Sequence, residues 1–377
     1  MLNKGKLLAE GSPNALKKQV QGLTFSAIPP AGIPARALQA RLIDAPDLII
    51  DAVPKGGNVS FIQQPEADKN HIKELLSGVT CVLRDADLED AFMMLLHQHA
   101  AQEANNKKGK TKSPQSSGQQ PHHAGDKPVI IVRDLVRQFG DFIAVARTSF
   151  NVAQGEIFGL LGPNGAGKTT TFRMLCGLLP ATSGQLEVAG LNLRTARAQA
   201  RGRIGYVSQK FALYGNLSVR ENMEFFGGAY GLRGKALQER VAALIEQFSL
   251  EPTALSKLLP AGYKQRLAMA TSLLHKPDIL FLDEPTSGID PLARRAFWRT
   301  ITDLALEGVT IIITTHFMEE AEYCDRIAIQ DAGDMLALGT PSEVRKQAGG
   351  IGMDMNSAFV AIVEQGRLAR QNKGKAA

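Results

Sequence analysis

The stretch GPNGAGKTT, residues 162–170, carries the clearest chemical signature in the chain. It matches GxxxxGK[ST], a pattern in which glycines let backbone N–H groups turn toward one anion with no Cβ in the way. We expect Lys168 to reach the β- and γ-phosphates of a nucleotide and the Thr169 hydroxyl to bind Mg²⁺. The nucleotide-binding candidates in this stretch are Gly162, Pro163, Asn164, Gly165, Ala166, Gly167, Lys168, Thr169 and Thr170.

Two further groups of polar residues follow apolar runs. In ILFLDEP, four apolar residues precede Asp283 and Glu284. We expect Asp283 to hold Mg²⁺ through water and Glu284 to polarise the attacking water as a general base. In IIITTHF, a similar run leads to His316, whose neutral ring could bond the γ-phosphate and orient that water. A lone acidic pair or a lone His is more often structural, and the position after an apolar strand is what favours chemistry.

Gln209, in YVSQK, is a weaker candidate on its own. It also follows a short strand, and its amide could contact Mg²⁺ or water and sense the γ-phosphate. The catalytic candidates are therefore Lys168, Gln209, Glu284 and His316, and the metal-binding candidates are Thr169, Gln209 and Asp283.

The elements that must position these groups are buried strands alternating with helices. EIFGLLG, ILFLD and VTIIITT are near-continuous apolar runs, which are typical of a parallel sheet covered on both faces. A strand before residues 162–170 and a helix after them supply the context that the phosphate-binding pattern requires. The chain is therefore predicted to contain an α/β domain whose candidate residues meet at one edge of the sheet.

Composition limits the possibilities without choosing among them. The chain has 377 residues, enough for two to three domains, with 44% hydrophobic and 21% charged residues. A net charge of +6 is compatible with nucleic acid, with an anionic membrane surface, or with no special partner. The three scattered cysteines argue against a disulfide framework and against zinc. With no signal peptide and no run of ~20 apolar residues, we expect any action on a membrane to pass through a partner.

The organisation along the chain includes an internal repeat. GKLLAEGSPNALKKQ (residues 5–19) aligns with GDMLALGTPSEVRKQ (residues 333–347), and DLEDAFMMLL (residues 87–96) aligns with DMNSAFVAIV (residues 354–363). The end of the main domain is thus present twice. We predict that the insertion in the first copy, about residues 20–87, folds as β-α-β-β-α-β, a small α+β unit.

A segment poor in core-forming residues separates the two copies. Residues 100–127 are rich in Gln, Ser, Gly, Lys and Pro, a composition that cannot offset its own ordering entropy. We predict a flexible linker here. Its lysines could touch phosphates and its two adjacent histidines a metal, but a solvated linker is the favoured interpretation.

In chain order, the phosphate-binding pattern, Gln209, LPAGYKQR, FLDEPTSGID and TTH resemble the ATP-binding cassette of ABC transporters. The resemblance covers residues 129 to about 347. It implies ATP and Mg²⁺ as ligands, adenine stacking on Phe139, and a D-loop at Asp290. In that family the signature loop of one cassette, here around Gly262, caps the ATP bound by another.

The resemblance also sets the expected domains. We expect an α/β P-loop NTPase cassette with a mixed, largely parallel sheet and a helical subdomain at about 211–262, preceded by the small α+β domain. The expected ranges are 1–99 for the C-terminal remnant of a first cassette with its regulatory insert, 100–127 for the linker, 128–347 for the cassette, and 348–377 for a C-terminal helix and tail. The core motifs of a first cassette are absent, so either the start is truncated or one cassette suffices.

The signature departs from the family pattern LSGGQ. Pro260 replaces Ser, Ala261 replaces Gly, and Tyr263 replaces Gln, while Gly262 remains. Without the serine, the signature lacks one hydroxyl donor to the γ-phosphate. Such a charge-assisted hydrogen bond is worth roughly 1.5–3 kcal/mol, so its loss would slow hydrolysis about tenfold to a hundredfold if nothing compensates. An aromatic residue followed by KQRLA is similar to the second cassette of two-cassette bacterial exporter ATPases of the YbhF type.

The resemblance implies an ATPase subunit of a multidrug or small-molecule exporter. Its expected partners are ABC-2-like transmembrane permease subunits and another cassette, as a homodimer or heterodimer, with no nucleic acid. Its expected location is cytoplasmic, peripheral on the inner face of the cell membrane. Two alternatives stay open: a nucleotide-binding regulatory or structural subunit with little turnover, and a soluble ATPase acting on ribosomes or DNA. The transported substrate is not encoded in these motifs.

Overall fold

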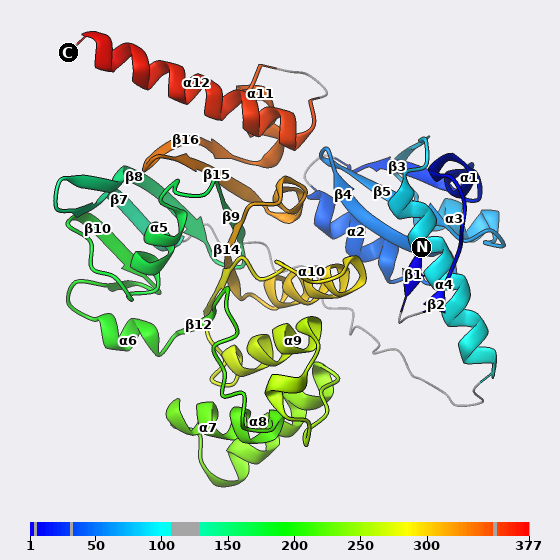
Figure 1. Ribbon diagram of the computed structural model, residues 1–377, viewed down its shortest axis with the longest axis horizontal. Coiled ribbons are helices and arrows are strands. Elements are labelled where there is room, and N and C mark those ends of the chain that lie inside the picture. Colours follow the sequence, from blue (N-terminus) through cyan, green and yellow to red (C-terminus); the bar gives the residue numbers. More distant parts are fainter. Residues whose placement is uncertain (4–5, 31–32, 107–127, 350–352, 377) are drawn as a thin grey trace. The chain divides into compact units, whose positions relative to one another are not determined.

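The structure is a computed structural model whose contacts divide the chain into two compact units, Met1–Gln120 and Pro121–Ala377 (Figure 1). The residues that it describes are 1–3, 6–30, 33–106, 128–349 and 353–376. Within these residues, no helix combines the length and apolar character needed to cross a bilayer.

The first unit contains the predicted β-α-β-β-α-β order. A short hairpin, β1 (Leu2–Asn3) and β2 (Lys6–Leu7), and helix α1 (Pro13–Lys18) precede it. The six elements are β3 (Thr24–Ile28), α2 (Ala35–Ile43), β4 (Ile49–Lys55), β5 (Asn58–Gln63), α3 (Lys69–Leu75) and β6 (Thr80–Leu83). The strand order is β4-β5-β3-β6 with antiparallel neighbours, the split βαβ arrangement. Gly56 and Gly57 turn the β4–β5 hairpin with φ of 65° and 82°, as the sequence predicts for a Gly-Gly turn.

Helix α4 (Leu88–Asn106) corrects the start of the predicted linker. The helix continues through residues 100–106, because Ala, Gln and Glu in AAQEANN are good helix formers that extend an already nucleated helix. The rest of the predicted linker, residues 107–127, lies outside the described residues.

The second unit is built on two sheets. An antiparallel sheet has the order β11-β10-β7-β8, formed by β7 (Pro128–Phe139), β8 (Phe142–Ala153), β10 (Ser183–Val188) and β11 (Leu191–Asn192). The larger sheet has the order β12-β13-β14-β9-β15-β16 and is parallel except for its last strand. Its strands are β12 (Ile204–Val207), β13 (Ile279–Asp283), β14 (Thr310–Thr315), β9 (Ile157–Leu161), β15 (Arg326–Asp331) and β16 (Asp334–Gly339). The three apolar runs identified in the sequence are its central, fully buried strands β9, β13 and β14.

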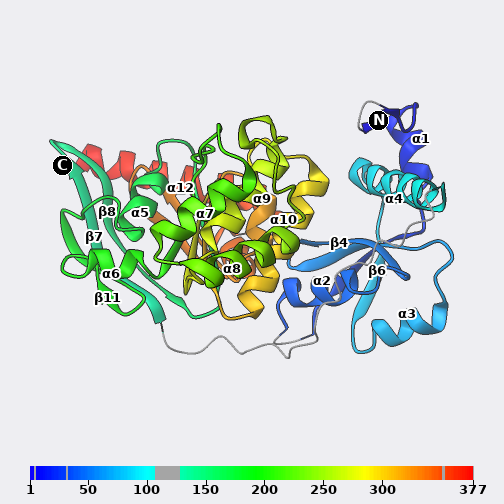
Figure 2. The same cartoon turned by 90° about the horizontal axis from the view of Figure 1, so that it is seen from below.

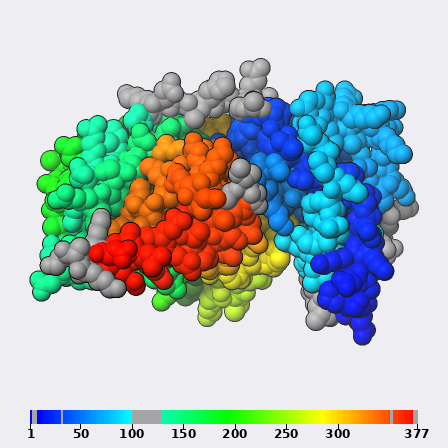
Figure 3. All heavy atoms as spheres, turned by 90° about the horizontal axis from the view of Figure 1, so that it is seen from above, coloured from blue at the N-terminus to red at the C-terminus, as the bar shows by residue number. Residues whose placement is uncertain are grey.

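Helices surround this core and form a separate lobe. Three helices contact strands of the two sheets: α5 (Lys168–Leu175), α6 (Arg197–Arg201) and α10 (Pro291–Leu306). Helices α7 (Val219–Ala229) and α8 (Gly234–Gln247) lie within the predicted helical subdomain of about 211–262, and α9 (Ala261–Ser272) starts at its end and gathers with them (Figures 1 and 2). Helices α11 (Pro341–Gln347) and α12 (Met355–Ala376) lie over the β15–β16 hairpin, the red and orange surface in Figure 3.

The sequence repeat is also a repeat of local structure. Gly11 and Gly339 precede α1 and α11 with φ of 158° and 156°. Ser12 caps α1 by accepting a hydrogen bond at 3.2 Å from the backbone N–H three residues on. Thr340 caps α11 in the same way, also at 3.2 Å, and both helices begin with proline. The same backbone path and the same cap therefore occur in both copies.

The second halves of the two copies match as well. Asp87 accepts a hydrogen bond from Asp90 N at 2.9 Å at the start of α4, and Asp354 accepts one from Ser357 N at 2.7 Å at the start of α12. In both units the short helix packs against the long one, α1 on α4 and α11 on α12. The repeat thus extends from sequence to capping and packing.

Candidate functional site

Residues 162–170 form a tight loop between β9 and α5. A Cβ on Gly162 would lie 2.1 Å from the Gln330 carbonyl oxygen, so no larger residue fits without moving the backbone. Gly167 caps α5 with φ of 98°, and a Cβ there would lie 2.4 Å from the Ala144 carbonyl oxygen. Asn164 and Gly165 are exposed on the loop, Thr169 is exposed in the first turn of α5, and Thr170 is half-buried behind it. The loop therefore presents backbone N–H groups and a helix N-terminus at one place, an arrangement suited to an anion.

Lys168 lies at the base of this loop. Its side chain is only 5% exposed, and Nζ donates hydrogen bonds to the carbonyl oxygens of Gly162 at 2.6 Å and Pro163 at 2.9 Å. Burial lowers the pKa of Lys168, and the nearby carboxylates of Glu284 and Asp283 oppose that shift. A further anion in the loop would stabilise the charged ammonium.

Asp283 ends β13 and is buried. Its Oδ1 accepts a hydrogen bond from Thr314 Oγ1 at 2.6 Å. Burial raises the pKa of Asp283, while this hydrogen bond and the positive charges of Arg173 and Lys168 act in the opposite direction. A divalent cation beside it would favour the ionised carboxylate.

Glu284 is the residue on which the candidate catalytic side chains converge. Gln209 Nε2 donates to Glu284 Oε2 at 2.8 Å, and His316 Nδ1 lies 3.1 Å from the same oxygen. The backbone of Glu284 has φ of 44°, which is uncommon for a residue other than glycine. The ends of β12, β13 and β14 thus bring together three of the predicted residues.

Thr314 is a residue that the motif analysis missed. Besides its contact with Asp283, its carbonyl oxygen and Oγ1 accept the Glu284 N–H at 3.1 Å and 3.0 Å. It therefore fixes both acidic residues from the neighbouring strand. Its only sequence signal is its place two residues before His316, at the end of an apolar run.

Phe139, the predicted adenine contact, ends β7. Phe139 is 45% exposed, and the Arg137 guanidinium lies 4.3 Å from the centroid of its ring. An exposed aromatic face is available for stacking, and the cation beside it orients the ring.

The altered signature begins helix α9. Pro260 is its N-cap residue, with no side-chain hydrogen bond, and its carbonyl accepts from Tyr263 N at 3.0 Å and Lys264 N at 2.9 Å. Pro260 thus stands one position before the first helical residue, where a missing N–H costs nothing.

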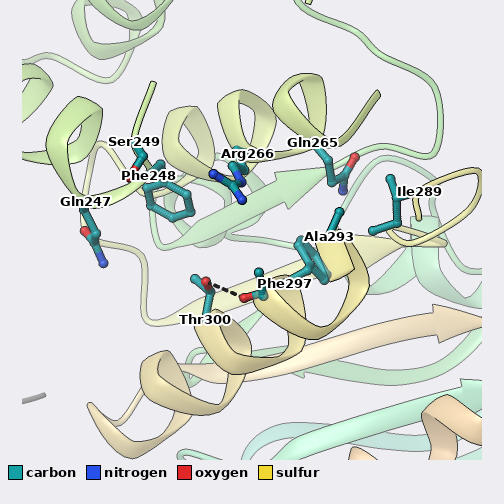
Figure 4. Close-up of a pocket in the computed structure, with 11 residues that line it drawn as sticks. Gln247, Phe248, Ser249, Gln265, Arg266, Ile289, Ala293, Phe297 and Thr300 are labelled. Carbon is teal, nitrogen blue, oxygen red and sulfur yellow. Dashed lines mark hydrogen bonds between the residues drawn. The ribbon is translucent and has the colours of Figure 1, made fainter. Parts of the chain in front are cut away.

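Gly262 and Asp290 belong to the region between α9 and α10. Gly262 lines a pocket of about 180 Å³ together with residues of α8, α9 and α10 (Figure 4). A Cβ on Gly262 would lie 3.3 Å from Ala293 Cβ, so glycine permits the two helices to approach closely. Asp290 caps α10, accepting a hydrogen bond from Ala293 N at 2.9 Å. Both residues therefore have local structural contacts here, and their predicted contacts with a nucleotide on another cassette stay predictions.

The residues present fit a magnesium–nucleotide ligand. In the described ranges, no cluster of three or more His, Cys, Asp and Glu side chains could hold a metal ion. A hydroxyl and a carboxylate, Thr169 and Asp283, are hard oxygen donors of the kind that Mg²⁺ uses when phosphate and water complete its shell. The Gln209 amide nitrogen is engaged with Glu284.

A phosphate-binding loop after β9, acidic residues at the end of β13 and a histidine at the end of β14 define a P-loop nucleotide-binding cassette. Residues 145–287 match the family model described as ABC transporter. The chain is 41% identical over 220 residues to the linearmycin resistance ATP-binding protein LnrL of Bacillus subtilis (strain 168), covering 58% of this chain and 71% of that protein. The chain belongs to the family of ABC transporter ATP-binding proteins.

A second relative matches almost the whole chain. The probable multidrug ABC transporter ATP-binding protein YbhF of Escherichia coli (strain K12) is 42% identical over 373 residues, 96% of this chain. The chain spans 62% of the length of that relative. The match includes the first unit as well as the cassette.

Solved structures agree with the fold. A structure titled "Structure of ATP binding subunit of ABC transporter" has a TM-score of 0.58 and 28% identity, covering 62% of this chain and 99% of that one. CbiO1 from Clostridium perfringens, described as part of the ABC transporter complex cbiONQ, has a TM-score of 0.54 and 29% identity, covering 58% of this chain and 91% of that one. The predicted cassette fold is confirmed.

Proposed function

We propose that this chain binds and hydrolyses ATP and drives export through separate membrane subunits. The observation that carries the proposal is the convergence of Gln209 and His316 on one carboxylate oxygen of Glu284, beside the buried Asp283. A general base, a group that orients it and a candidate metal ligand at one sheet edge are the parts that hydrolysis of a phosphoanhydride requires.

The roles of the residues follow from their positions. The backbone of 162–170 and Lys168 would bind the phosphates, and Phe139 would stack on adenine. Glu284 would accept a proton from the attacking water, with His316 holding the carboxylate and contacting the γ-phosphate. Lys168 now donates to two loop carbonyls, and in the nucleotide complex it would exchange these for phosphate oxygens.

We further propose that Mg²⁺ is held by Thr169 and Asp283, with Gln209 near it. When bound, Mg²⁺ neutralises charge on the β- and γ-phosphate oxygens. The Thr314 hydroxyl holds one oxygen of Asp283 and leaves the other available to a ligand or a bridging water.

The proposed partners are ABC-2-like permease subunits and another cassette, at the inner face of the cell membrane. The names of the relatives support export of drugs or other small molecules, because they include multidrug, linearmycin resistance and Nod factor export proteins. The repeated hairpin, caps and helices support the interpretation of residues 1–99 as the C-terminal part of a first cassette carrying an α+β insert.

Phosphate release tests the enzymatic part of the proposal. The full chain, alone and with its permease in vesicles, should release phosphate from ATP in the presence of Mg²⁺ and stop when EDTA is added. ATP binding measured in parallel separates loss of turnover from loss of affinity. Absence of phosphate release in both preparations, with ATP bound, would overturn hydrolysis.

A second candidate function is nucleotide binding with little turnover. The Pro260 N-cap, which has no side-chain donor, favours it because the signature serine's hydroxyl is missing. ATP-dependent dimerisation without phosphate release, even with the permease, would select this function.

A further inference from the structure

We propose that Glu320 is a positioning residue that ties the loop carrying Glu284 to the loop carrying His316. The proposal rests on the proposed ATP hydrolysis, which it deepens by naming a residue outside the motifs. Glu320 lies in η2 (Met318–Tyr323), a 3-10 helix that follows β14, and it is 1% exposed.

The carboxylate of Glu320 accepts one hydrogen bond from each of the two loops. Its Oε1 accepts from Thr286 Oγ1, and its Oε2 accepts from Thr315 Oγ1 at 2.6 Å. Thr286 comes two residues after Glu284, and Thr315 comes directly before His316. One buried side chain therefore bridges the segment that follows β13, which carries Glu284, and the last residue of β14, which precedes His316.

The Thr315 side chain also holds the backbone of the residue that follows His316. Thr315 Oγ1 accepts a hydrogen bond from Phe317 N at 3.0 Å while it donates to Glu320. The backbone is thus held on both sides of His316, and the ring is left free to reach Glu284 at 3.1 Å.

Packing alone does not account for a carboxylate in this place. Burying an ionised group costs free energy unless hydrogen bonds or an opposite charge compensate it. Arg294 Nε lies 4.0 Å from Glu320 Oε1, and the Arg294 guanidinium also lies over the Phe317 ring. The close contacts are the two threonine hydroxyls, and charge-assisted O–H···O⁻ bonds are the stronger and more directional kind.

The expected consequence is a selective effect on the chemical step. Misplacement of a reacting group by about 1 Å can cost on the order of 10²-fold in rate. The phosphate-binding residues 162–170 are on another loop. Loss of the Glu320 hydrogen bonds should therefore lower kcat and leave ATP affinity unchanged.

The test uses the full chain with Glu320→Gln and Glu320→Ala, the threonine variants Thr286→Val and Thr315→Val, and Glu319→Gln as the exposed neighbouring control. We expect kcat to fall at least tenfold in Glu320→Ala, with partial recovery in Glu320→Gln, and the ATP Kd to stay within about twofold of wild type in every variant. Adding Thr286→Val to Glu320→Ala should cause no further loss, because both remove the same tie. An unchanged kcat, or kcat and ATP affinity falling together with Tm, would overturn the proposal.

A second readout does not depend on turnover. The ring resonances of His316 in the nucleotide-free protein, assigned by their loss in His316→Gln, should move in Glu320→Gln and Thr286→Val but not in Glu319→Gln. If wild type shows no hydrolysis and these resonances move, the proposal of ATP hydrolysis is wrong and the positioning role of Glu320 is supported. If wild type hydrolyses ATP while both the resonances and kcat stay unchanged in the Glu320 variants, the positioning role of Glu320 is wrong and the proposal of ATP hydrolysis is supported.

Discussion

His316 Nδ1 lies 3.1 Å from Glu284 Oε2, and this contact joins the ends of the neighbouring parallel strands β14 and β13. Gln209 reaches the same oxygen from the end of β12. The contact places a titratable ring beside the proposed general base, so that the orientation of the carboxylate depends on the histidine.

We predict that His316→Ala lowers kcat about tenfold to a hundredfold. The expected loss corresponds to one charge-assisted hydrogen bond of about 1.5–3 kcal/mol. ATP affinity should change little, because the residues proposed to bind the phosphates are Lys168 and the loop 162–170. Steady-state kinetics with a parallel ATP-binding titration would check this. A large rise in Kd with unchanged kcat would show that His316 binds ATP instead of serving the chemical step.

The phosphate-binding loop offers a matched pair of glycine variants. We predict that Gly167→Ala lowers the free energy of unfolding by about 2–3 kcal/mol, because the new Cβ would meet both a positive φ and the Ala144 carbonyl oxygen. Gly165→Ala should cost only about 1 kcal/mol, because its φ of 81° is strained but the space around it is open. Urea unfolding of the two variants would measure the difference. Equal losses would show that the close approach at Gly167 does not matter.

Most of the site follows from the sequence because its parts are contiguous motifs on apolar strands. Residues 162–170, Asp283, Glu284 and His316 each directly follow a buried run, and parallel strands bring their carboxyl ends to one edge. Thr314 and Glu320 could not be found in this way. Their roles depend on which strand lies beside which and on side chains that meet across 31 and 34 residues, information that no local pattern contains.

The start of the predicted linker also depends on more than local composition. Composition marked residues 100–127 as unable to form a core, but helix α4 extends to Asn106, because each residue added to a helix that has already formed gains a backbone hydrogen bond. The altered signature shows the same limit. The sequence shows that Pro260 departs from the family pattern, and only the structure shows that it caps helix α9.

We predict that Pro260→Ser changes the ATPase rate by less than about a hundredfold, the upper range of one charge-assisted hydrogen bond. Serine can cap α9 and supply a hydroxyl donor, while the loss of proline makes the unfolded chain more flexible, so stability should change little. Phosphate release and Tm of the variant would show this. A thousandfold rise in rate would mean that the natural signature disables the site.

The attachment of α12 should depend on pH. Burial raises the pKa of Asp331, but hydrogen bonds and charges from Arg367 and Arg370 outweigh it and hold the pKa below the ordinary value of 3.8. The contribution of this carboxylate to stability is therefore fully present above pH 3.8 and is lost as the pH falls through the lowered pKa of the folded state.

Asp331→Asn tests this dependence. We expect it to lower the free energy of unfolding by up to about 1 kcal/mol at pH 7, because Arg367 is half-exposed and Arg370 keeps its contact with Asp334. The difference from wild type should be constant between pH 7 and about pH 5 and shrink only in stronger acid. Asp334→Asn, which removes a longer 3.7 Å contact with Arg370, is the control and should have a smaller effect. A difference that grows between pH 6 and pH 4 would contradict this assignment.

The most direct test of the central claim is the phosphate release rate of wild type and Glu284→Gln at saturating ATP and Mg²⁺. Glutamine can keep contacts with Gln209 and His316 but cannot accept a proton from water, so the rate should fall by about 10²–10⁴ while ATP still binds. Equal rates in the two proteins, with ATP bound by both, would contradict the account of Glu284 as the general base.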